Sequence, residues 1–289
     1  MIVGVHGIGH YPRALRLRST EAAADEMSAL WAEALDDGLT ALTGHAPTPT
    51  PQVRVAYYSH LLHRGTPQGE QDPGDLDEDE QDLFTGWVDQ LIVASAAPVP
   101  QGTRTYRARA AGEWLAGRLG DHVLGFALAF AREVSTYLNN DQRRQAVRDA
   151  VAAVIVEARP RILIAHSLGS VAAYESLWQH PELEIELLVT LGSPLAMPGV
   201  VFPRLTPTPA SGRGSRPPGV AAWANLADVG DIVAIPRAGL APFFDGVTCD
   251  EPAINIDSRA FHGVRHYLRA RETAQAIAPY ISDGLSSPI

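Results

Sequence analysis

A strand and a helix follow one another around Ser167 with almost no chain between them. This junction constrains the fold more than any other feature of the sequence. Arg161–Ala165 is a short apolar strand, and the alanine-rich stretch Leu168–Gln179 has the composition of a helix. A turn this sharp requires small side chains two residues before and two residues after the serine, and Ala165 and Gly169 occupy those positions. The pattern is therefore G-x-S-x-G with alanine in place of the first glycine.

This junction gives Ser167 a special chemical environment. The turn at the end of a buried strand lifts the hydroxyl group to the edge of the sheet in a strained backbone conformation. The hydroxyl group also lies at a helix N-terminus, where backbone N–H groups and the helix dipole stabilise a negatively charged oxygen. We therefore expect Ser167 to be a nucleophile. The alternative is a serine that only caps the helix.

Strands and helices alternate along much of the chain, which predicts an α/β fold with a parallel sheet and helices on both faces. The chain has 289 residues, of which 46% are hydrophobic, so we expect one domain over residues 1–289. The predicted strands are Ile2–Val5, Val53–His60, Arg161–Ala165, Ile185–Leu191, Val220–Leu226 and Ala253–Asp257. The predicted helices are Thr20–Leu42, Tyr106–Leu119, Asp121–Leu138, Asp141–Ala158, Leu168–Gln179 and Gly263–Ile281.

Residues 63–140 interrupt the alternation, and we expect a helical insertion there. Eight of the 13 residues from Glu70 to Asp82 are acidic, which predicts a solvated loop. The helix Asp121–Leu138 is apolar on nearly every side. Such a helix is typically buried in the core, and the alternatives are a lid over an apolar pocket or a surface that joins two copies of the chain.

A glycine-rich turn follows the first predicted strand, in the string Val5-His6-Gly7-Ile8-Gly9-His10. Glycine at a strand end allows a backbone N–H group to approach a ligand closely. An oxyanion hole needs two such N–H groups from different elements, aimed at one point. We assign the N–H groups of Ile8 and Leu168 to this role, and we expect His6 to hold the turn in place.

A serine nucleophile requires a base, and the base requires a carboxylate that orients it. His262 lies between the last predicted strand and the last predicted helix, and His266, one helical turn later, is the alternative base. Asp231 precedes an apolar Ile-Val pair that can anchor a loop, whereas Asp228 lies at the end of the preceding strand. We favour His262 and Asp231, which gives the chain order Ser, Asp, His.

With these residues in this order, the sequence resembles the α/β-hydrolase superfamily, on its lipase- and esterase-like side. The resemblance covers residues 1–62 and about 141–289 but not 63–140, where a family lid or cap would lie. It implies a triad of Ser167, His262 and Asp231, and a minimal, mostly parallel sheet of about six strands. The alanine in the serine turn is a departure that lipase-like members tolerate. Four segments carry the resemblance: Val5–Gly9, Ala165–Gly169, Thr190–Leu195 and Asp231–Pro236.

Composition argues against several other classes of protein. All 23 basic residues are arginine, so the chain has no lysine for a P-loop or a Schiff base. A net charge of −10 argues against nucleic acid as a partner. The sequence contains no convincing metal or dinucleotide motif, so we expect no cofactor. No apolar run is long enough to span a bilayer, and the single cysteine, Cys249, together with the lack of a signal-peptide pattern, predicts a cytoplasmic location.

The sequence therefore predicts a serine hydrolase of carboxylic esters or related acyl compounds, acting on a small-molecule or lipid-like acyl substrate. Two alternatives stay open. One is an acyltransferase or cyclising enzyme with the same triad, because the first half-reaction is identical. The other is a non-catalytic binding module that kept the fold. The apolar helix also leaves a homodimer open.

Overall fold

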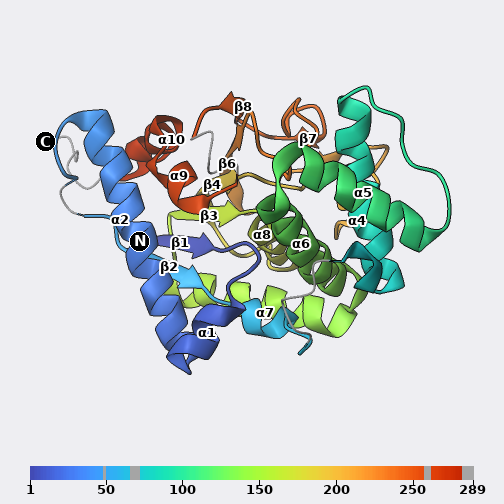
Figure 1. The fold of residues 1–289 in the computed structure, drawn as a ribbon. Helices are drawn as coiled ribbons and strands as arrows, with labels where there is room; N and C mark the ends of the chain where they lie inside the picture. Colours follow the sequence, from blue (N-terminus) through green and yellow to red (C-terminus); the bar gives the residue numbers. More distant parts are fainter. Residues whose placement is uncertain (48–49, 66–71, 257–261, 282–289) are drawn as a thin grey trace, which may run out of the picture.

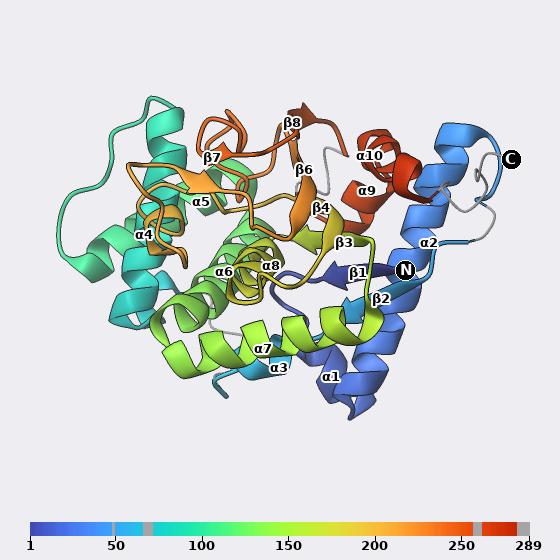
Figure 2. The ribbon, with the colours of Figure 1, turned by 180° about the vertical axis from the view of Figure 1, so that it is seen from behind.

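The computed structural model describes residues 1–47, 50–65, 72–256 and 262–281, and it has an α/β fold around a six-stranded sheet (Figures 1 and 2). The strand order is β2-β1-β3-β4-β6-β8, and every neighbouring pair is parallel. The α/β fold and the parallel sheet predicted from the alternation are confirmed. The strands are β1 (Ile2–Val5), β2 (Val53–Ala56), β3 (Ile162–His166), β4 (Ile185–Leu191), β6 (Val220–Asp228) and β8 (Cys249–Ile254), and a small second sheet pairs β5 (Gly214–Ser215) with β7 (Phe244–Asp245).

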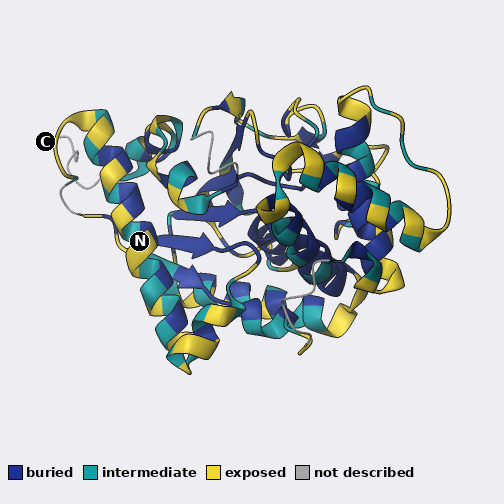
Figure 3. Ribbon diagram, in the orientation of Figure 1, coloured by how far each residue is buried: buried dark blue, intermediate teal, exposed yellow. Residues whose placement is uncertain are grey.

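Helices cover both faces of this sheet. Side chains of β3 alternate between two apolar cores: Ile162 and Ile164 pack with one set of helices, and Leu163 and Ala165 pack with the other. The central strands are buried on both faces (Figure 3), as continuous apolar runs predict for a parallel sheet. The first set includes α2 (Thr20–Thr43), α9 (Val264–Arg269) and α10 (Arg271–Ile281), and the second set includes α7 (Asp141–Ala158) and α8 (Leu168–Gln179).

Residues 63–140 contribute three long helices to the second core. They are α4 (Glu78–Ala94), α5 (Arg104–Leu119) and α6 (Asp121–Asn139), and they lie beyond the carboxyl ends of the strands, far from α2 (Figures 1 and 2). Trp87 on α4 and Phe130 on α6 are fully buried, with ring centroids 4.6 Å apart. Both belong to the apolar cluster that also holds residues of β1 and α8. The helix expected at Asp121–Leu138 is therefore packed as a core helix.

The solvated loop expected at Glu70–Asp82 is wrong in its second half. Residues 66–71 lie outside the described residues, and α4 begins at Glu78. The carboxylate of Asp77 accepts the N–H of Glu80 at 2.9 Å, and the carboxylate of Glu80 accepts the N–H of Asp77 at 3.0 Å. Acidic side chains in a first helical turn satisfy free N–H groups and interact favourably with the helix dipole. The run of charges therefore begins a helix.

Two strands differ from their expected bounds by more than two residues at one end. The strand expected at Val53–His60 ends at Ala56, because the N–H of Tyr58 donates to Nε2 of His6 at 3.1 Å and not to a neighbouring strand. A short helix, α3 (Ser59–Leu62), follows. The last strand was expected at Ala253–Asp257. The observed strand, β8, begins earlier, at Cys249, and ends at Ile254, and Asp257 lies outside the described residues.

The closing helix expected at Gly263–Ile281 is divided at Ala270, whose backbone is extended (φ −61°, ψ 141°). Thr273 stabilises the break, because its hydroxyl group donates to the carbonyl of Tyr267 at 2.6 Å.

In the described part of the chain, none of the helices has the length and apolarity that crossing a bilayer requires. Besides α3, three short helices were not expected: α1 (Tyr11–Leu17), η1 (Pro73–Asp75) and η2 (Phe202–Arg204).

A buried ion pair joins three helices of the second core. Glu175 on α8 is 1% exposed and receives two hydrogen bonds from Arg144 on α7. Tyr137 on α6 donates to the same carboxylate at 2.7 Å, and the N–H of Thr206 donates to it at 3.0 Å. These donors compensate for the loss of hydration of the carboxylate.

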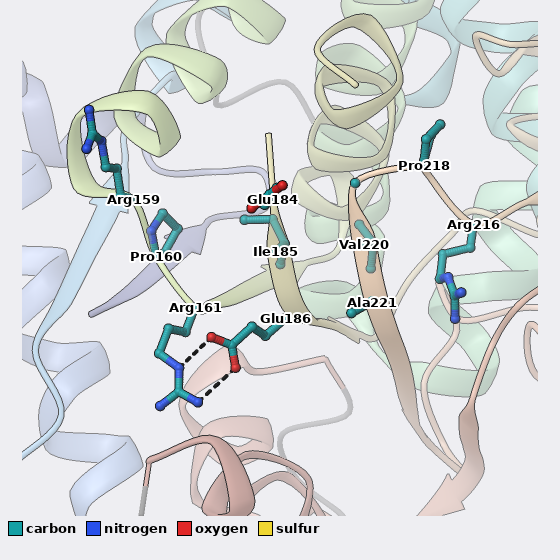
Figure 4. A pocket seen from close by; sticks show the side chains of 11 residues that line it. Arg159, Pro160, Arg161, Glu184, Ile185, Glu186, Arg216, Pro218, Val220 and Ala221 are labelled. Atoms are coloured by element: carbon teal, nitrogen blue, oxygen red, sulfur yellow. Dashed lines mark hydrogen bonds and ion pairs between the residues drawn. The ribbon is translucent and has the colours of Figure 1, made fainter. Parts of the chain in front are cut away.

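We expect Arg144→Ala to destabilise the protein by about 3–5 kcal/mol, because it leaves the buried Glu175 carboxylate with only the more distant Arg148, whose guanidinium lies 3.9 Å away. Urea unfolding followed by circular dichroism measures this loss. Arg161→Ala is the matched control, since Arg161 pairs with Glu186 at the surface (Figure 4) and such a pair contributes at most about 1 kcal/mol. Equal losses in the two variants would contradict the assigned role of the buried pair.

Candidate active site

Ser167 lies at the turn between β3 and α8, at the carboxyl edge of the sheet. Its backbone has φ 55° and ψ −131°, a left-handed conformation that residues with a side chain rarely adopt. Such a conformation costs of order 1–3 kcal/mol and persists only where the surroundings enforce it. Here the N–H of Ser167 donates to the carbonyl of Leu191 at 3.0 Å, and the hydroxyl group of Ser170 donates to the carbonyl of Ser167 at 2.6 Å. The strained turn expected from the sequence is present.

The turn after β1, His6–His10 (the β1 turn), touches the serine turn so closely that only glycine fits at two positions. A Cβ atom on Gly7 would lie 2.7 Å from Cβ of Ser167. A Cβ atom on Gly169 would lie 2.3 Å from the carbonyl oxygen of His6. The two turns are close because β1 and β3 are adjacent parallel strands, with Val5 opposite Ala165, so both turns leave the same edge of the sheet.

Asp231 and His262, the carboxylate and base that the sequence favoured, are hydrogen-bonded to each other. Nδ1 of His262 lies 2.7 Å from Oδ2 of Asp231, and both side chains are buried. Tyr267 donates its hydroxyl proton to the same oxygen at 2.7 Å, and the N–H groups of Val233 and Ala234 donate to Oδ1 at 2.8 and 3.3 Å. Four donors thus surround the carboxylate. The proton on Nδ1 leaves Nε2 of His262 as the free base.

The alternative acid and base, Asp228 and His266, are not part of the hydrogen-bonded pair of Asp231 and His262. The carboxylate of Asp228 accepts the N–H of Gly230 at 2.8 Å and the N–H of Ile256 at 2.9 Å, so it shapes the loop before Asp231. His266 lies on α9 and is partly exposed. The hydrogen bond between a histidine and the Asp231 carboxylate is made by His262.

His262 also lies against the residue that precedes the serine. Nε2 of His166 donates to the carbonyl of His262 at 3.0 Å, and the two rings are 4.6 Å apart. Oγ of Ser167 and Nε2 of His262 are both buried, and neither has a hydrogen-bond partner among the described residues. Two buried polar atoms without partners therefore lie at one edge of the sheet, and buried polar atoms are seldom left unpaired without a reason.

The β1 turn is held rigidly by His6. The N–H of Tyr58 donates to Nε2 of His6, so Nδ1 carries the proton and donates to the carbonyl of Gly7 at 2.6 Å. The hydroxyl group of Tyr58 donates to the carbonyl of His6 at 2.5 Å. The pKa of His6 is held well below its ordinary value, mainly because the ring is buried, and the ring therefore stays neutral. The backbone of Ile8 follows this fixed segment, and Leu168 begins α8.

Two helices of the 63–140 region contact the same site. Trp87 on α4 donates its indole N–H to the carbonyl of Ile232, next to Asp231, at 2.8 Å. Phe126 on α6 packs against the ring of His262, with centroids 5.2 Å apart. Buried aromatic side chains at helical spacing look like ordinary core residues, so the sequence pattern did not predict these two contacts.

Neither of two large cavities is lined by Ser167, Asp231 or His262. One has a volume of about 630 Å³ and lies at the amino ends of β3, β4 and β6, the edge opposite the site; Arg159, Arg161 and Arg216 line it (Figure 4). The other has a volume of about 720 Å³ between α4, α5 and the loop of Ile232, and its lining is largely apolar. Within the ranges that the structure describes, no cluster of three or more histidine, cysteine or acidic side chains could hold a metal ion.

The chain matches no protein-family model, no curated protein and no solved structure in the comparisons made with each.

We expect Gly192→Ala to break the contact between Asp231 and His262. The added methyl group would lie 2.6 Å from Oδ2 of Asp231 and 3.0 Å from Nδ1 of His262. The measurement is the far-downfield proton resonance of the His262 ring N–H, which should disappear. Gly199→Ala is the control, since Gly199 also has a positive φ (68°) but open space around it. A resonance that survives in Gly192→Ala would refute the expected collision.

Proposed function

We propose that the protein is a serine hydrolase that cleaves a carboxylic ester or a related acyl bond. One observation carries the proposal: a histidine oriented by a buried carboxylate lies at the sheet edge where a serine is held in a strained turn. The resemblance of the sequence to lipase-like α/β-hydrolases supports the same reaction. The roles follow from general triad chemistry.

In the proposed reaction, Oγ of Ser167 attacks the carbonyl carbon of the substrate, and Nε2 of His262 takes the hydroxyl proton. The carbonyl oxygen becomes an oxyanion, which accepts the N–H groups of Ile8 and Leu168. The C–O bond to the leaving alcohol breaks as His262 returns the proton to it, leaving an acyl group on Ser167. Asp231 stabilises the protonated imidazole and fixes its tautomer.

Water then completes the cycle. His262 takes a proton from a water molecule, and the resulting hydroxide attacks the acyl carbon. The bond from that carbon to Oγ of Ser167 then breaks as His262 passes the proton back to Oγ. The products are a carboxylic acid and the free serine. A hydrogen bond from Oγ to Nε2 forms in this scheme when substrate binds, as catalytic hydrogen bonds are often long or poorly aligned in a free enzyme.

The surroundings of the site favour an apolar acyl group. Phe126 covers the ring of His262, and the apolar cavity beside Ile232 has the size of sites that bind small apolar ligands. The chemical class proposed is therefore a small-molecule or lipid-like ester, with no cofactor in the reaction.

We expect a fluorophosphonate probe to label the protein at Ser167, because the probe requires an activated serine. Ser167→Ala should abolish labelling and lower kcat on a p-nitrophenyl ester by about three to six orders of magnitude. Ser176→Ala is the control on the same helix, where a buried hydroxyl group bonds only to backbone carbonyls. Full turnover in Ser167→Ala would exclude the proposed nucleophile.

We expect Asp231→Asn to lower kcat by about 10⁴-fold, because an amide cannot stabilise the imidazolium or its tautomer. Asp228→Asn should lower kcat by less than about tenfold, since Asp228 bonds to the loop backbone. Steady-state kinetics on the same ester, with circular dichroism to verify folding, measures both. The reverse ranking would make Asp228 the catalytic carboxylate.

A further inference from the structure

Glu133 is a buried carboxyl group that the proposed reaction does not use. It lies on α6 and is 9% exposed. Its Oε1 accepts the backbone N–H of Gly9, in the β1 turn, at 2.8 Å. Its Oε2 is buried and has no hydrogen-bond partner among the described residues. A carboxyl group with a single donor is costly to bury, so its place beside the β1 turn needs an explanation.

The helix that carries Glu133 meets the candidate site along one face. Residues 126, 130 and 133 are spaced by four and three positions, which places them on the same side of a helix. Phe126 packs against His262, and Phe130 packs against Trp87, which holds the loop next to Asp231. Glu133 reaches the β1 turn. One helix therefore contacts the site on both the base side and the oxyanion side.

Glu133 completes the anchoring of the β1 turn. At the start of the turn, Tyr58 fixes His6 through two hydrogen bonds. Gly9 has a left-handed backbone (φ 81°), and a Cβ atom on it would meet nothing within 4 Å. Packing around the Gly9 α-carbon therefore does not fix the orientation of the Gly9 backbone. The hydrogen bond from its N–H to Glu133 fixes that orientation. The N–H of Ile8 lies between these two fixed points, and planar peptide units transmit their orientation to it.

We propose that Glu133 is a positioning residue: its carboxyl group fixes Gly9 and thereby aims the N–H of Ile8 at the substrate oxygen. This inference rests on the proposed function, which gives that N–H group its role. The carboxyl group acts through the backbone and does not touch the reacting atoms.

The charge of Glu133 sets a pH limit on this arrangement. Burial raises the pKa of Glu133 to about 7, and the hydrogen bond from the backbone opposes the shift. The groups that face it stay neutral there, because burial raises the pKa of Tyr57 and Tyr58 and lowers the pKa of His6 and His10. Above that pH, a buried negative charge lies beside the position where the oxyanion forms, and it opposes the reaction.

Two further ionisable groups border this cluster and keep a constant charge. Burial lowers the pKa of His60, so its ring is uncharged near neutral pH. Arg13, which faces His10 and Tyr57, is ion-paired with Glu26. A titration near neutral pH within this cluster therefore belongs to Glu133.

We expect Glu133→Ala to lower kcat on the p-nitrophenyl ester by about tenfold to hundredfold, with KM changed by less than about threefold, because loss of oxyanion positioning affects the transition state. Glu133→Gln should recover most of the activity at about pH 6, since the amide oxygen also accepts the N–H of Gly9. Glu113→Gln, an exposed charge on α5, is the control and should change neither constant.

The ratio of kcat in Glu133→Gln to kcat in the native chain should rise by about threefold to tenfold from about pH 6 to about pH 8. Any other titration in the site is shared by both proteins and cancels in the ratio. A constant ratio, or a Glu133→Gln variant as inactive as Glu133→Ala, would overturn the proposal. If Glu133→Ala does not fold, the pH-dependent ratio decides alone.

A second measurement separates this inference from the proposed function. In Ser167→Ala protein labelled with ¹⁵N, the Gly9 amide resonance should shift with a midpoint near pH 7, the value set by burial of Glu133. The shift should vanish when Glu133→Gln is added. No shift in Ser167→Ala protein would overturn the role of Glu133 whatever the kinetics show. A shift in Ser167→Ala protein, together with a native protein that the fluorophosphonate does not label, would refute only the proposed hydrolase.

Discussion

The close approach of two backbone turns at the carboxyl edge of β1 and β3 is the constraint on which the rest of the site depends. Parallel pairing of the two strands brings the turns to one edge, and glycine at positions 7 and 169 allows the backbones to touch. A side chain at either position would separate Ser167 from the β1 turn. The left-handed backbone of Ser167 is a consequence, because the chain must reverse within one residue to begin α8.

Two buried carboxyl groups near this edge have opposite environments. Asp231 receives four hydrogen bonds, from His262, Tyr267 and two backbone N–H groups. Glu133 receives one, and burial raises its pKa to about 7. Hydrogen bonds to a carboxylate favour its charged form, whereas burial with a single donor favours the neutral acid, which is the cause of the raised pKa of Glu133. The fold thus provides one carboxyl group with four hydrogen-bond donors and one with a single donor within the same region.

The predictions that agree with the structure rest on short, local patterns. The strand, serine turn and helix around Ser167 follow from apolar runs and small residues within about 20 positions. The loop that carries Asp231 also depends on local sequence, since the Asp231 carboxylate accepts the N–H groups of Val233 and Ala234 in the same turn. The prediction of a solvated loop for the acidic stretch was wrong where α4 begins, because the same charges are compatible with a solvated loop and with the first turn of a helix. Only the capping hydrogen bonds between Asp77 and Glu80 distinguish the two.

The sequence by itself determined the alternation of strands and helices, the serine turn and the candidate residues, because each depends on neighbours along the chain. Tertiary structure alone decided which side chains support them. Tyr267 contacts Asp231 across 36 residues, Trp87 contacts Ile232 across 145, and Glu133 contacts Gly9 across 124. Such contacts form where distant helices pack on a common core, and packing depends on the shape of the folded chain, which no local pattern encodes.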